Sequence, residues 1–198
     1  MAKKPDKQRR RSARERLLDA AQLFDTNGYG AVGIDVIIAE AGVAKRTLYR
    51  HFASKDELIA AYLARANTRY LGWIDEELAQ VADPVERLRT YAELVQARTT
   101  SPASLGCTFQ VAAAEFPSLE HLGHKEALAH KIAVREKLLG LAREAKLREP
   151  EVLANALLLL IDGAWAAARM FGAQPGTPAT TLVEAANVLI DRHSEGRE

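Results

Sequence analysis

Apolar residues recur at spacings of three and four along most of the chain, and this periodicity constrains the fold more than any other sequence feature. Leu17, Ala20, Ala21 and Phe24, for example, share one face of a helix. Apolar and polar residues do not alternate over any useful length, and Ala, Leu, Glu and Arg, which favour helices, dominate. The sequence therefore predicts an all-α fold.

Glycine and proline divide this pattern into about nine helices. Asn27-Gly28-Tyr29-Gly30 ends the first helix and Gly42 ends the second, while prolines start three later ones. The predicted ranges are Ser12–Thr26, Ile34–Ala41, Lys45–His51, Ser54–Leu78, Pro84–Ala97, Leu105–Ala114, Leu119–Lys146, Pro150–Phe171 and Pro178–Arg192.

Composition and charge exclude several classes of protein. Apolar residues make up 48% and charged residues 27% of the chain, which does not fit a disordered or a membrane protein. The most apolar stretch contains Asn155, Asp162 and Arg169, which are costly in lipid, so it is predicted to be a buried helix. Residues 1–55 carry 12 Lys and Arg against 6 Asp and Glu, whereas the remainder carries 15 against 20. A polyanionic partner is therefore expected at the N-terminal end.

The segment from Ile34 to Leu58 has the pattern of a helix-turn-helix. Gly42 occupies the position where a residue in the left-handed conformation ends the helix predicted over Ile34–Ala41. The segment also has apolar residues that can hold two short helices together. The second helix presents donors for phosphates and base edges in the major groove, namely Lys45, Arg46, Thr47, Tyr49, Arg50 and His51.

A capping box follows this segment. Ser54 is expected to cap the amide of Glu57, and the Glu57 side chain to reach back to the amide of Ser54. The remaining first-turn amides, beside the charge of Lys55, can bind a phosphate.

The run AGVAKRTLYRHFASKDEL resembles the DNA-binding signature of the TetR family of repressors. Thr47, Leu48, Tyr49, His51, Phe52, Lys55 and Leu58 all fall on that family's pattern. The resemblance covers about the first third of the chain. It implies phosphate contacts from Thr47, Tyr49 and Lys55, and base reading by Lys45 and Arg46. Ala44 and Gly33 depart from the pattern, because the family often has capping side chains there.

The expected organisation is a basic arm and DNA-binding domain over residues 1–55, followed by a ligand-binding and dimerisation domain over residues 56–198. The last two helices are rich in Leu and Ala and are expected to form a four-helix interface in a homodimer. The candidate interface residues are Leu157, Leu160, Ala164, Ala168, Leu182, Ala186 and Leu189. The alternative is that these helices are buried only against their own chain.

Fold analogy with the family places an apolar ligand pocket, with a few polar groups, among the helices of the second domain. The candidate lining residues are Trp73, Tyr91, Phe109, Gln110, Phe116, Asn155, Asp162, Trp165 and Arg169. The alternative is that these aromatic residues belong to the core.

Together these features predict a cytoplasmic repressor that binds a palindromic operator in double-stranded DNA and is released by a small, apolar ligand. The alternative is a similar DNA-binding protein that is controlled without a small-molecule inducer. The sequence contains no known catalytic motif, so neither an enzyme nor a cofactor is expected. Cys107 is interpreted as a buried apolar residue rather than a redox sensor, and His121 and His124 as ordinary histidines rather than metal ligands. The arm from Lys3 to Arg11 suits either a solubilising tail or minor-groove binding.

Overall fold

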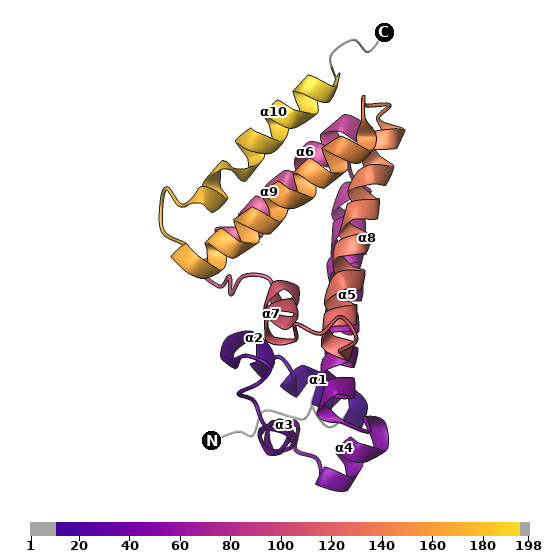
Figure 1. The fold of residues 1–198 in the computed structure, drawn as a ribbon, viewed down its shortest axis with the longest axis vertical. Helices are drawn as coiled ribbons and strands as arrows, with labels where there is room; N and C mark the ends of the chain where they lie inside the picture. The colour runs from indigo at the N-terminus through magenta and orange to yellow at the C-terminus, as the bar shows by residue number, and fades with distance from the viewer. Residues whose placement is uncertain (1–10, 195–198) are drawn as a thin grey trace, which may run out of the picture. The chain divides into compact units, whose positions relative to one another are not determined.

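The computed structural model describes residues 11–194, and within this range the chain forms helices and no strand. The elements are α1 (Ala13–Ala20), α2 (Leu23–Asn27), α3 (Ile34–Ala41), α4 (Lys45–His51), α5 (Lys55–Leu78), α6 (Pro84–Thr99), α7 (Thr108–Glu115), α8 (Leu122–Glu144), α9 (Pro150–Phe171), the 3-10 helix η1 (Pro178–Thr181) and α10 (Leu182–Ser194) (Figure 1). The predicted all-α fold is confirmed. Residues 3–10 of the basic arm lie outside the described residues.

The helices α3, α4 and α9 begin and end at the predicted residues, but the first predicted helix is divided into α1 and α2. The amide of Gln22 donates to the carbonyl of Asp19, and the amide of Phe24 to that of Ala21, in both cases three residues back. These hydrogen bonds span three residues instead of the four of an α-helix, and they tighten the chain into a turn that ends α1. The last predicted helix also begins with a tighter turn, η1.

Close packing groups the described chain into two compact units. The first contains residues up to 66 together with 111–127, and the second contains 67–110 together with the residues from 128 onward. The predicted domains instead met at a single boundary after residue 55. The division differs because α5, α7 and α8 are continuous helices that each contribute residues to both units.

The first unit is held together by an apolar core and by polar bonds from α5. Phe24 is fully buried and stacks on Tyr29 with a centroid distance of 5.2 Å. The Tyr62 hydroxyl donates to Asp25, and burial raises the pKa of Tyr62, so the hydroxyl keeps its proton. Arg65 donates to Asp19 at 2.8 Å, which fixes α5 against α1.

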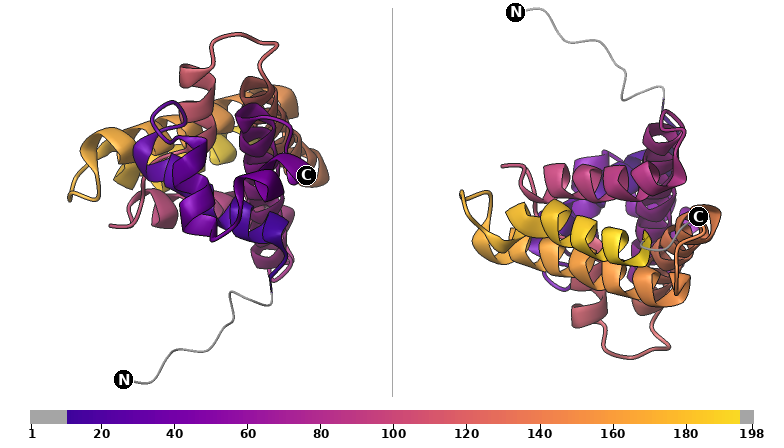
Figure 2. Two further views of the ribbon diagram at one scale, coloured as in Figure 1. Left: turned by 90° about the horizontal axis from the view of Figure 1, so that it is seen from below. Right: turned by 90° about the horizontal axis from the view of Figure 1, so that it is seen from above.

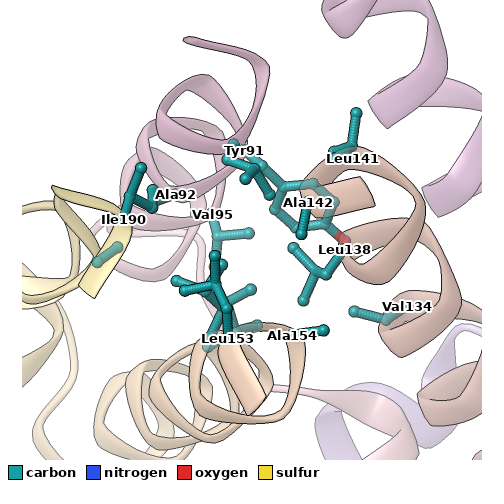
Figure 3. Packing of buried hydrophobic residues seen from close by; sticks show 14 of the residues in the cluster. Tyr91, Ala92, Val95, Val134, Leu138, Leu141, Ala142, Leu153, Ala154 and Ile190 are labelled. Atoms are coloured by element: carbon teal, nitrogen blue, oxygen red, sulfur yellow. The ribbon is translucent and has the colours of Figure 1, made fainter. Parts of the chain in front are cut away.

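The second unit packs α6, α9 and α10 side by side (Figure 2), with α8 antiparallel to α9. Figure 3 shows Tyr91 of α6, Leu138 of α8 and Leu153 of α9 gathered in one apolar core. By length and composition α9 could span a membrane. One of its faces lies in this core, however, as predicted for a buried helix.

Candidate nucleic-acid interface

The turn between α3 and α4 depends on Gly42. Its backbone has φ 60° and ψ 43°, the left-handed conformation that a side chain disfavours. Its amide donates to Ala39 at 3.2 Å and the amide of Val43 donates to Ile38 at 3.3 Å, which satisfies the last carbonyls of α3. The carbonyl of Gly42 accepts a bond of 3.2 Å from Arg16 of α1. These bonds fix the direction in which the chain enters α4.

One face of α4 is buried and the other is open. Leu48 has no exposed surface and Phe52, which follows α4, is 3% exposed. The open face carries most of the predicted DNA-binding residues, namely Lys45, Arg46, Tyr49, Arg50 and His51, whereas Thr47 and Lys55 are half-buried. All seven residues lie in the first unit.

The caps around α4 and α5 follow the sequence with one correction. Ala44 and Gly33 make no side-chain cap bonds. The amide of Glu57 donates to Ser54 Oγ at 3.1 Å, as predicted. The Glu57 carboxylate, however, accepts from the amide of Ala53 at 2.7 Å, so the predicted bond to the amide of Ser54 is wrong. The Glu57 carboxylate thus satisfies the amide of the residue before the cap instead of the amide of the cap itself.

Two of the candidate cations already have partners within the first unit. The Lys55 ammonium donates to the carbonyl of Gly30 at 3.4 Å, which leaves it with further protons to donate. The Lys45 ammonium donates to Asp35 Oδ1 at 3.1 Å. This bond raises the pKa of Lys45, so the group stays positively charged.

Glu115, at the end of α7, binds the loop that precedes α3. Its carboxylate accepts from the amide of Tyr29 at 3.0 Å and from the amide of Gly30 at 2.6 Å. Gly28 has φ 85°, a conformation that favours glycine, and a Cβ atom there would lie 2.9 Å from Glu115 Oε1, so a side chain would also displace the carboxylate. This contact could not be predicted from the sequence. The two glycines around Tyr29 predict a turn, but no pattern indicates which acid binds its amides.

The two histidines considered as metal ligands have structural roles. The His121 ring stacks on Phe116 with a centroid distance of 4.0 Å, and its Nε2 lies 3.4 Å from Asp56 Oδ2. His124 Nδ1 hydrogen-bonds to the carbonyl of Phe116 at 2.8 Å. Among residues 11–194, no three His, Cys, Asp or Glu side chains gather as metal ligands would.

The predicted ligand-binding residues are only partly brought together. All except Phe116 belong to the second unit. Gln110 Nε2 donates to the carbonyl of Asp162 at 3.0 Å. By contrast, Asn155 accepts from Arg135, and Arg169 donates to the carbonyl of Leu105. The remaining predicted residues are aromatic: Tyr91 and Phe109 are buried, while Trp73 and Trp165 are half-buried.

The structure adds polar partners to this region of the second unit. The Lys131 ammonium pairs with the Asp162 carboxylate and lies 3.7 Å from Cys107 Sγ, and Cys107 is buried as predicted. His130 stacks on Phe109 with a centroid distance of 3.6 Å. Burial lowers the pKa of His130 to about 3, with the charge of Lys131 contributing, so the ring is neutral at ordinary pH. Lys131 could not be identified as the partner of Asp162 from the sequence.

The predicted dimer residues differ in exposure. Leu157, Ala164, Ala168, Leu182 and Ala186 are buried within their own chain. Leu160 and Leu189 are half-buried and line an open, mostly apolar groove between α9 and α10. The same two helices carry Leu159, which is 74% exposed, and Val188, which is 63% exposed. The exposed apolar residues of these two helices therefore include two that were not among the predicted interface residues.

Comparison with known proteins identifies relatives of the N-terminal segment. Residues 17–62 match the family described as bacterial regulatory proteins, tetR family. The HTH-type transcriptional activator FasR of Mycolicibacterium smegmatis is 39% identical over 77 residues, which are 39% of this chain and 35% of FasR. The HTH-type transcriptional repressor KstR of Mycobacterium tuberculosis is 37% identical over 79 residues, which are 39% of this chain and 36% of KstR. The matched region thus spans about a third of each of these relatives.

The likeness to a solved structure extends over nearly the whole chain. The crystal structure of a TetR-family transcriptional regulator from Streptomyces coelicolor is 32% identical, with a TM-score of 0.84. The match covers 92% of this chain and 96% of that protein. These relatives are transcriptional regulators and not enzymes.

The two hydrogen bonds that Glu115 accepts should stabilise the first unit measurably. Glu115→Gln leaves one oxygen for two amides and places an NH2 group against the other amide, so the free energy of unfolding should fall by about 1 kcal/mol. Urea denaturation measures this change. Glu120→Gln is the matched control, because Glu120 is exposed and pairs with Lys125. Equal effects of the two substitutions would contradict this role of Glu115.

Proposed function

This chain belongs to the TetR family of DNA-binding transcriptional regulators, and we propose that it is a cytoplasmic, homodimeric repressor whose second unit binds a small apolar ligand. The observation that carries the proposal is the pairing of a buried face with an open cationic face on α4. Leu48 and Phe52 anchor the helix, so Lys45, Arg46 and Tyr49 lie on its exposed side, where they can meet DNA.

The proposed contacts divide between phosphates and bases. Thr47, Tyr49 and Lys55 are proposed to bind phosphates, with Arg50 and His51 beside them, while Lys45 and Arg46 read base edges. Phosphate contacts carry no sequence information, but they fix the position of the helix in the groove. Two recognition helices in a dimer would read half-sites about 34–36 Å apart on a palindromic operator.

The exposed apolar face of α9 and α10 supports the proposed dimer. Val188 lines the groove between the two helices together with Leu160 and Leu189, and Leu159 is exposed beside Leu160 on α9, so these apolar side chains would lose water on association. A second copy of the chain would present the same face, so a twofold axis allows four helices to pack together.

We propose that α7 passes the ligand signal to the DNA-binding unit. Gln110 bonds to Asp162 in the second unit, and Glu115, five residues later in the chain, binds the amides of Tyr29 and Gly30 in the first. A helix rises about 1.5 Å per residue, so the two residues are about 7.5 Å apart along the axis, or about one and a half turns. A ligand that displaces Gln110 would thereby shift Glu115 and the loop before α3.

The phosphate role of Tyr49 and Lys55 predicts a loss of affinity that is independent of DNA sequence. Tyr49→Phe removes only a hydroxyl from a side chain that is 48% exposed, so folding should be unaffected. Affinity should fall equally for operator and random duplexes. Lys55→Ala should also reduce the slope of log affinity against log salt concentration by about one. Fluorescence anisotropy across a salt series measures both effects. The control is Arg143→Ala, which removes an exposed cation from the second unit and should change neither the affinity nor the salt slope. Unchanged affinity in both Tyr49→Phe and Lys55→Ala would refute the phosphate contacts.

The dimer proposal predicts that charge on the α9 and α10 face produces monomers. Leu159→Asp and Val188→Asp together would place two carboxylates in each half of the interface, where burial without partners is costly. Sedimentation equilibrium should show a dimer for the unaltered chain and a monomer for the double variant. Leu119→Asp alters a leucine of the first unit that is 66% exposed and should remain dimeric. A monomeric unaltered chain would eliminate the proposal.

Ligand control predicts that a small apolar compound both stabilises the protein and weakens its binding to DNA. A ligand at about 100 times its Kd adds about 2.7 kcal/mol to the free energy of unfolding. A thermal-shift screen of the full chain, followed by DNA titration with each hit, tests both effects. A screen without a stabilising compound would favour control by a partner protein or constitutive binding instead.

A further inference from the structure

Asp35 and Lys45 form an ion pair on the exposed surface of the two helices of the motif. Asp35 lies in the first turn of α3 and Lys45 is the first residue of α4, and Lys45 Nζ lies 3.1 Å from Asp35 Oδ1. The two side chains are 81% and 60% exposed, respectively. Water and salt screen such a pair, so it contributes little to stability. Its effect is to hold one acceptor and one donor side by side at the beginning of the proposed reading helix.

The edge of a G·C base pair in the major groove has the complementary arrangement. Guanine O6 is an acceptor and the cytosine N4 amino group is a donor. These two atoms are hydrogen-bonded to each other, so they lie about 3 Å apart. The lysine and the carboxylate of this chain have nearly the same separation, so each can face its complement on one base pair.

We propose that Asp35 and Lys45 read a single G·C base pair together, with Asp35 as a specificity-determining residue that accepts from cytosine N4 while Lys45 donates to guanine. This inference rests on the proposed binding of DNA through α4. Guanine is favoured over thymine as the partner of Lys45, because O6 and N7 of guanine are adjacent acceptors for one ammonium group. In thymine, O4 is a single acceptor beside the methyl group.

A carboxylate near DNA would otherwise only repel it, and this makes the proposal testable. Replacing Asp35 by alanine removes a negative charge and should strengthen binding to all DNA through the general electrostatic attraction. The proposal adds a second effect, which charge alone does not produce: loss of preference at one base pair in each half-site. Glu40 is the matched control, since it is an exposed carboxylate on the same helix, α3.

The experiment is binding-site selection from randomised double-stranded DNA with the full chain and with Asp35→Ala, Lys45→Met, the double variant and Glu40→Ala. The unaltered chain should select G·C at one position of each half-site. Asp35→Ala and Lys45→Met should lose that preference and keep the others. Measured on duplexes that differ at this position, the ratio of Kd values for A·T and G·C should fall roughly tenfold. The double variant should lose no more than either single variant, because the two residues read one base pair together.

The outcomes separate this inference from the proposed function. The reading role of Asp35 would be overturned if the unaltered chain selects a defined sequence and Asp35→Ala keeps every one of its base preferences. This holds whether the overall affinity of Asp35→Ala rises, as expected for Glu40→Ala, or falls equally for all sequences. Loss of the same preference in Glu40→Ala would also overturn it, because charge would then be the cause. If the unaltered chain shows no salt-dependent binding to any duplex, the proposed DNA binding itself is wrong and the inference falls with it.

Discussion

The left-handed backbone at Gly42 is the constraint on which the recognition segment depends. α3 and α4 contain eight and seven residues, too few for either helix to be stable alone in water. Ile37 of α3 and Leu48 of α4, on either side of the turn, are both fully buried, and Arg16 of α1 donates to the carbonyl of Gly42 in the turn itself. The burial of Leu48 in turn determines which side of α4 meets solvent. The direction of the cationic side chains thus follows from one backbone conformation and a few apolar contacts.

The parts of the fold that local sequence determines could be predicted from the sequence. α3, α4 and α9 have the predicted ends because glycine, proline and the residues around them act over a few positions. The break between α1 and α2 could not be predicted, because neither Ala21 nor Gln22 is a helix breaker. Burial of Phe24 against Tyr29 and Tyr62 accompanies that break, and such packing involves residues distant in sequence.

The candidate sites also contain some features that could be predicted from the sequence and others that could not. The open face of α4 could be predicted, because the periodicity of a helix separates Leu48 from its cationic neighbours. The partners of Tyr29 and Asp162 could not be predicted, since Glu115 is 86 residues from Tyr29 and Lys131 is 31 residues from Asp162. A single boundary after residue 55 was expected, where the charge balance changes from basic to acidic. The helices α5, α7 and α8 cross between the two units, and no change in composition marks those crossings.

The short length of α7 matters for the proposed response to a ligand. Eight residues form too short a helix to be stable by itself, so its position depends on the contacts of its side chains. Gln110 makes its contact in one unit and Glu115 makes two in the other. A ligand changes the affinity for DNA only if it binds two states of the protein with different free energies. The proposed response therefore requires a second position of α7, in which Gln110 suits the ligand and Glu115 no longer accepts from the amides of Tyr29 and Gly30.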